Sequence, residues 1–192
     1  MDVTCLNCGV EVALDTPGSV NAALSPELKE KITSGTLFLW ECPACGRKKL
    51  LNFPLVYNDP QRKYIIALSP TPVSGEGEIP GYTVRQVATP GELIEKIKIF
   101  DSELDDIAVE MCKFVTAREL GKDIELKFFS VGGSDHVITL TYPENGEMQM
   151  LEIGFNVYED CCGIISRNPV IRDKAKGLVR VDQAWLFQFF GG

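Results

Sequence analysis

Apolar residues follow a helical period in the middle of the chain, over residues 93–115, where they recur every three or four positions. Thr89, with Glu92 three residues later, has the pattern of a capping box and marks the start. Asp101 and Ser102 interrupt the segment, so we expect two helices. The acids on the other side predict a solvated face or, alternatively, a surface for a partner or a cation: Glu92, Glu95, Glu103, Asp105, Asp106 and Glu110.

A period of two replaces this pattern after Gly121, which is expected to end the second helix. Alternating residues predict three strands, at 123–131, 136–142 and 147–158. Asn145-Gly146 is the dipeptide typical of a tight hairpin, so the strands should form an antiparallel meander. The apolar segment 183–190 then predicts a docking helix, a final strand or a dimer contact.

Short strands and one helix are expected in the N-terminal part. Ser25 is a good N-cap, and Pro26 suits the first position of a helix that runs to Ile32. The pattern of apolar residues predicts strands at 11–14, 36–41, 49–57, 64–68 and 82–87.

Four of the seven cysteines form two Cys-x-x-Cys-Gly motifs, one with Cys5 and Cys8 and the other with Cys42 and Cys45. Two thiolates three positions apart reach the same ion when the chain turns sharply between them. Two such turns supply four soft ligands, and a tetrahedral cage of four cysteines is a common closed zinc site. We therefore expect one structural zinc ion per chain.

Glycine follows the second cysteine of each motif, as Gly9 and Gly46. Glycine readily takes the positive φ that a sharp turn needs, and backbone amides in the turn then support the sulfurs. Two alternatives stay open, because an iron–sulfur cluster uses the same ligands and one motif alone could be a thioredoxin-like redox pair. The paired layout favours zinc over iron, and the strand-like sequence after both motifs disfavours the redox pair.

These motifs resemble the CpXC domain family, which is named for its Cys-Pro-x-Cys motifs. The resemblance rests on both cysteine motifs, the Pro-Glu-Leu-Lys-Glu-Lys segment between them, NFPLVYNDPQRKYIIAL and ELIEKIKIFDSELDD, and it covers about residues 3–120. Leu6 stands where the family name implies proline, which leaves ligation intact because proline supplies no ligand. The resemblance implies the four cysteine ligands and no activity.

The predicted fold class is α+β, with an N-terminal zinc-ribbon-like β unit that carries a helical insertion, central helices and a C-terminal antiparallel sheet. We expect residues 1–120 to form a zinc-binding domain that includes the central helices. Residues 121–192 are expected to form a β-rich region, either a small second domain or an extension of the same core.

Net charge is −8, and the acidic excess lies in residues 91–160. Nucleic-acid binding usually begins with a basic surface, so this charge disfavours it. The local patch Arg47, Lys48 and Lys49, beside the second cysteine pair, keeps it possible.

The sequence also indicates no association with a membrane. No stretch approaches the ~20 apolar residues that span a bilayer, and the N-terminus lacks the pattern of a signal peptide. We therefore expect the cytoplasm, where thiols stay reduced and paired cysteines more often bind metal.

Signals of an enzyme are weak. His136 is the only histidine, and after the segment Gly132-Gly133-Ser134-Asp135 we expect it in a surface turn. Cys161-Cys162 would suit thiol redox chemistry, but the acids that precede it should raise the pKa of both thiols.

The favoured function is therefore that of an interaction or scaffold protein that contacts a protein partner or a second copy of itself. Nucleic-acid binding through the Arg47 patch and thiol redox chemistry through Cys161-Cys162 are the alternatives.

Overall fold

The structure is a computed structural model that describes residues 1–71, 73, 77–122, 124–132 and 136–190. It has the predicted α+β class. In chain order its elements are β1 (Asp2–Thr4), β2 (Glu11–Ala13), β3 (Ser19–Asn21), α1 (Pro26–Thr33), η1 (Thr36–Phe38), β4 (Leu39–Glu41), β5 (Lys48–Leu50), β6 (Leu55–Asp59), β7 (Tyr64–Leu68), β8 (Thr83–Val87), α2 (Pro90–Asp101), α3 (Asp106–Leu120), β9 (Lys127–Gly132), β10 (Val137–Glu144), β11 (Glu147–Gly154), α4 (Phe155–Arg167), α5 (Pro169–Lys174) and α6 (Gln183–Phe190).

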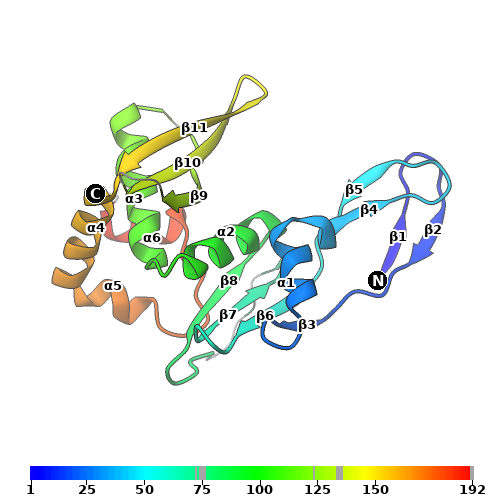
Figure 1. Cartoon of the computed structure of the whole chain (residues 1–192), viewed down its shortest axis with the longest axis horizontal. Helices are drawn as coiled ribbons and strands as arrows, with labels where there is room; N and C mark the ends of the chain where they lie inside the picture. Colours follow the sequence, from blue (N-terminus) through cyan, green and yellow to red (C-terminus); the bar gives the residue numbers. More distant parts are fainter. Residues whose placement is uncertain (72, 74–76, 123, 133–135, 191–192) are drawn as a thin grey trace.

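Two short hairpins form an arm at one end of the molecule, which we call the ribbon arm (residues 1–14 and 39–51). β1 pairs antiparallel with β2, and β4 pairs antiparallel with β5. Figure 1 shows both hairpins extending away from the body, with their turns at the far end. The segment 36–41 is a strand only from Leu39, because Gly35, with φ of 77°, leads into the 3₁₀ turn η1.

A four-stranded sheet in the order β3-β6-β7-β8 joins the arm to the body. β3 is parallel to β6, β6 antiparallel to β7, and β7 parallel to β8. Alternate residues of β6 and β7 are buried, and they pack in the same apolar cluster as residues of α1 and α2. Cys5, Cys42 and Trp40 belong to this cluster too, so one apolar core runs from the arm into the sheet.

The central helices begin and end where the sequence predicts. Thr89 Oγ1 accepts a hydrogen bond from the N–H of Glu92 at 3.2 Å, and Glu92 Oε2 accepts one from the N–H of Ala88 at 2.9 Å. Asp105 caps α3 by accepting from the N–H of Ile107 at 2.9 Å. Gly121 ends α3 with φ of 60°.

A three-stranded meander in the order β11-β10-β9 covers α3 on the C-terminal side. Asn145 and Gly146 form its tight turn, with φ of 54° and 83°. The predicted third strand is too long, since β11 ends at Gly154 and helix α4 begins at Phe155. After Gly154 the chain is helical because its inward-packing residues recur at helical spacing, as Phe155, Tyr158 and Ile165 do.

The apolar segment near the C-terminus is a docking helix. Leu186 of α6 is fully buried in a cluster with Ala108 and Met111 of α3. No helix in the part of the chain that the structure describes is long and apolar enough to cross a membrane.

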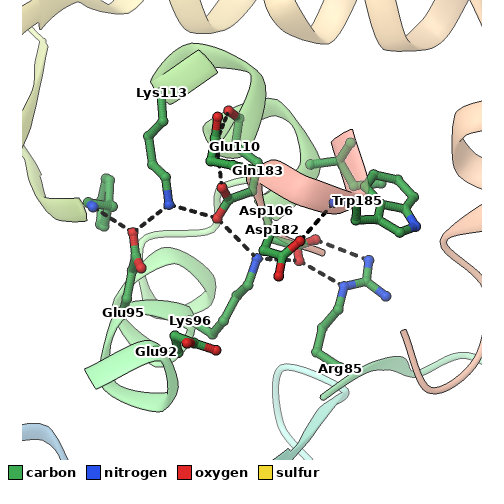
Figure 2. A network of polar contacts seen from close by, with 12 residues as sticks. Arg85, Glu92, Glu95, Lys96, Asp106, Glu110, Lys113, Asp182, Gln183 and Trp185 are labelled. Atoms are coloured by element: carbon green, nitrogen blue, oxygen red, sulfur yellow. Dashed lines mark hydrogen bonds and ion pairs between the residues drawn. The ribbon is translucent and has the colours of Figure 1, made fainter. Parts of the chain in front are cut away.

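The prediction of a solvated acidic face on the central helices is wrong for three of its six members. Glu95, Asp106 and Glu110 are 6%, 2% and 3% exposed. Figure 2 shows that they face three cations, Arg85, Lys96 and Lys113, which are 5%, 4% and 4% exposed. Glu92 and Asp105 are partly buried caps, and Glu103 is exposed.

Three cations balance the three buried acids. Asp106 accepts from Arg85 Nε of β8 at 2.7 Å and from Lys96 Nζ of α2 at 3.0 Å. Lys113 Nζ donates to Glu110 Oε1 at 2.8 Å and to Glu95 Oε1 at 3.0 Å. We call these six residues the ion network; their formal charges sum to zero, which makes their burial tolerable.

Candidate metal centre

Each cysteine motif forms a turn at the tip of one hairpin of the ribbon arm, and the two turns have matching backbone hydrogen bonds. The N–H of Gly9 donates to the carbonyl of Cys5 at 2.8 Å, and that of Gly46 to the carbonyl of Cys42 at 2.9 Å. The two glycines have φ of 73° and 69°. A side chain at this φ would be strained, so glycine is what allows the chain to close the turn.

The two turns bring their four sulfurs together although the motifs lie far apart in sequence. The Cys5 and Cys45 sulfurs are 3.7 Å apart, and those of Cys8 and Cys42 are 3.6 Å apart. All four lie within 4.8 Å of one another. These separations exceed the ~2.0 Å of a disulfide bond, and the four thiols are free.

Two of the sulfur–sulfur distances, 3.7 and 3.6 Å, match those of a tetrahedral metal site, and all four sulfurs lie within 4.8 Å of one another. Metal–sulfur bonds of about 2.3 Å at tetrahedral angles separate the sulfurs by about 3.8 Å, close to these two distances. The first cysteine of each motif, Cys5 and Cys42, is buried, whereas the second, Cys8 and Cys45, is exposed. The four cysteines therefore lie close enough to bind one metal ion at the surface of the arm.

The thiols differ in how readily each loses its proton. Backbone hydrogen bonds from Asn7 and Cys8 lower the pKa of Cys5. A backbone hydrogen bond with Arg47 is the largest cause that lowers the pKa of Cys45 to about 6. At Cys8 a backbone hydrogen bond with Val10 acts in the same direction, but the loss of water around the sulfur and the three neighbouring thiols outweigh it and raise the pKa to about 12. Four adjacent negative charges repel one another, so full deprotonation requires a cation among them.

Comparison with protein families gives a match to the CpXC protein family over residues 3–113. The match spans more than half of the 192 residues and includes all four clustered cysteines. This chain belongs to the CpXC family. Comparison with curated proteins and with solved structures finds no match.

The predicted basic patch of this CpXC protein, Arg47, Lys48 and Lys49, lies beside the cysteine cluster. Arg47, Lys48 and Lys49 are exposed, and they line a pocket with Cys5, Leu6 and Trp40. Lys48 pairs with Glu41 across β4 and β5 at 3.6 Å. The opposing acid reduces the local positive charge, so the patch is weaker than the sequence suggests.

The vicinal cysteines lie on α4, and a third cysteine from α3 lies next to them. Cys161 is buried in one apolar cluster with Cys112, whose side-chain hydrogen bond lowers the pKa of Cys161. Burial is the main cause that raises the pKa of Cys162. The expectation that both pKa values rise is thus wrong for Cys161, because the sequence does not show its contact with Cys112.

The single histidine lies outside this arrangement. His136 is exposed and has φ of 46°, as expected for a surface turn. The preceding residues Gly133, Ser134 and Asp135 lie outside the described residues.

The ion network is the cluster of charged groups that sequence reasoning missed. Four of its six residues line a cavity of about 170 Å³ between α2, α3 and the segment before α6: Glu95, Lys96, Glu110 and Lys113. Gln183 Nε2 of α6 donates to Glu110 Oε2 at 2.9 Å (Figure 2), and Gln183 also lines this cavity. One signal was available, since Glu110 and Lys113 are spaced i, i+3 on a helix and can pair.

Proposed function

We propose that Cys5, Cys8, Cys42 and Cys45 bind one structural zinc ion. Four thiolate ligands complete a tetrahedral zinc site and leave no open position for a substrate or a water nucleophile. The observation that carries the proposal is the cluster of four sulfurs within 4.8 Å of one another, drawn from two like turns. Gly9 and Gly46 would support it by holding the turns that aim backbone amides at the sulfurs.

Metal content tests this proposal. Elemental analysis of the purified protein should give one zinc ion per chain, and Cys42→Ser should lose it. Cys162→Ser is the matched control, because that thiol lies outside the cluster, and it should keep the metal. Iron in place of zinc, or full metal content in Cys42→Ser, would contradict the proposal.

We further propose that the protein acts as an interaction or scaffold protein and that the ribbon arm is its contact surface. Leu6 and Leu50 on the arm are 90% and 72% exposed, which is unusual for large apolar residues. Leu6 lies in the turn between Cys5 and Cys8, and Leu50 ends β5 in the hairpin that carries Cys42 and Cys45, so a metal bound to the four cysteines would hold both side chains in fixed positions. The buried acids of α2 and α3 are not available for this role.

Photo-crosslinking tests the contact surface. A photoreactive amino acid at position 6 in the intact protein should crosslink repeatedly to one species, a protein partner or a second copy of this chain. The control position is Leu24, which is 80% exposed but lies between β3 and α1, outside the arm. Equal labelling from both positions would argue against a specific surface on the arm.

Nucleic-acid binding is the second candidate, favoured by the exposed Arg47, Lys48 and Lys49 next to Trp40 and the cysteine cluster. Binding of this kind loses affinity steeply with salt. We expect any affinity for single-stranded RNA at ~50 mM salt to disappear in a Lys48→Glu, Lys49→Glu double variant. No binding by the unaltered protein at that salt concentration removes this candidate.

A reducing compartment suits both candidates, and we propose the cytoplasm. In the cytoplasm thiols stay reduced, which agrees with a zinc site made of thiolates and with the free cysteines Cys112, Cys161 and Cys162. Thiol redox chemistry at Cys161-Cys162 has little support, since Cys161 is 2% exposed.

A further inference from the structure

Strand β11 is a long sheet edge with no strand on its outer side among the described residues. The other edges are short or covered: β3 has three residues, β8 makes a bridge between Arg85 and Val179, and β9 lies against α2. β11 has eight residues and pairs with β10 in an unbroken register, and in the part of the chain that the structure describes no strand pairs with its other side. In Figure 1 the β10–β11 hairpin extends beyond the helices.

Proteins usually protect such an edge with lysine, proline or a bulge. The sequence of β11, EMQMLEIG, contains neither residue, and its pairing with β10 has no bulge. Met148 and Met150 are instead 62% and 63% exposed. An exposed edge of this kind pairs readily with another strand.

The hairpin determines which backbone groups are free. In a two-residue turn the flanking residues, Glu144 and Glu147, form a hydrogen-bonded pair. Bonding alternates along the strand from that pair, so the backbone groups of Met148, Met150 and Glu152 point away from β10. These three residues supply the donors and acceptors for an added strand.

We propose that β11 pairs antiparallel with β11 of a second copy, with Met150 on the two-fold axis. Met150 then faces its own counterpart, and Met148 of one copy faces Glu152 of the other. All three outward residues form hydrogen-bonded pairs, each of which exchanges two bonds. The two meanders become one continuous sheet, as in a closed dimer whose two subunits use the same surface.

Charge and side-chain chemistry agree with this register. With Met150 on the axis, Glu152 of one copy faces Met148 of the other, whereas an axis at Glu152 would set two Glu152 carboxylates directly opposite each other. On the exposed face the methionines of both copies come together. Methionine is flexible and fits irregular apolar contacts well. A second copy is therefore a suitable occupant of this edge.

This inference goes beyond the proposed function, because no residue of the ribbon arm takes part. The test is the mass of the full chain by sedimentation equilibrium over a dilution series. The unaltered protein should reach twice its 21.2 kDa as concentration rises. Met150→Pro removes the outward N–H without removing a bond to β10, and Met150→Lys sets two lysines against each other; both should remain monomers.

Leu24→Lys, between β3 and α1, is the matched control, since it adds the same charge at an exposed apolar position outside both surfaces, and it should still form the dimer. Circular dichroism of each variant establishes that it has folded, and Met150→Lys decides the matter if Met150→Pro does not fold. A mass of 21.2 kDa for the unaltered protein at every concentration overturns the proposal. So does a dimer that persists in a folded Met150→Lys. Neither result depends on whether zinc is bound. The zinc proposal and the dimer proposal can therefore be contradicted separately, the first by metal analysis and the second by the mass in solution.

Discussion

At the residue scale, the acids of the central helices differ in what faces them. Glu103 is exposed, whereas Asp106 is 2% exposed between Arg85 and Lys96. A buried ion pair contributes little net stability compared with an apolar pair, but removing one partner leaves the other charge buried alone. The ion network should therefore be sensitive to single substitutions at any of its members.

Asp106→Asn should lower the free energy of unfolding by about 3–5 kcal/mol, because Arg85 and Lys96 would lose the charge that compensates for their burial. The matched control is Asp160→Asn on the exposed side of α4, which should change stability by less than about 0.5 kcal/mol. Urea unfolding followed by circular dichroism measures both. A cost at Asp106 no larger than that at Asp160 would show that the network is not a unit of stability.

The same residue makes stability depend on pH. Burial alone would raise the pKa of Asp106, but the charges of Lys96 and Arg85 outweigh it and hold the pKa well below its ordinary value. A depressed folded pKa stabilises the protein above the unfolded value of about 3.9, and this contribution is lost as pH falls toward the folded value. The free energy of unfolding should fall with pH below about pH 4 and fall less steeply in Asp106→Asn. Equal slopes would contradict this assignment.

At the element scale, the sequence predicted the features that depend on a few neighbouring residues, namely turns and helix caps. The two turns that bring the four cysteines together, the caps at Thr89 and Gly121 and the turn at Asn145-Gly146 each follow from a few adjacent residues. The ion network did not follow, because Asp106 finds its partner Arg85 on a strand 21 residues earlier. The start of α4 did not follow for a related reason. The apolar residues near position 155 fit both the two-residue period of a strand and the helical period, and it is their packing against α3 that selects the helix.

The hairpin turn gives a prediction at this scale. Gly146→Ala should cost about 1–2 kcal/mol, because φ of 83° is strained for any residue with a Cβ atom. Gly18→Ala is the matched control: it has open space around its Cβ position and no positive φ, so it should be close to neutral. Thermal unfolding compares the two variants. An equal shift in Tm would mean that the turn does not constrain the hairpin.

At the scale of the whole molecule, the buried apolar residues form three clusters. One joins the ribbon arm to the four-stranded sheet, and the other two surround α3 together with α4, α6 and the meander. Ile99 and Val109 of the central helices share a cluster with Phe128 and Leu140 of the meander. We therefore propose that residues 121–192 extend the core of residues 1–120 and do not fold apart.

This arrangement predicts how far the effect of the metal reaches. The arm consists of strands of three residues, and a four-thiolate zinc site contributes on the order of 10 kcal/mol of binding energy to folding. A strong chelator, or Cys42→Ser, should remove the amide protection of the arm, residues 1–14 and 39–51, in hydrogen exchange. The strands of the meander should keep theirs, because their clusters contain no residue of the arm. Loss of protection along the whole chain would mean that the metal holds one cooperative unit, and full protection everywhere would mean that the arm folds without it.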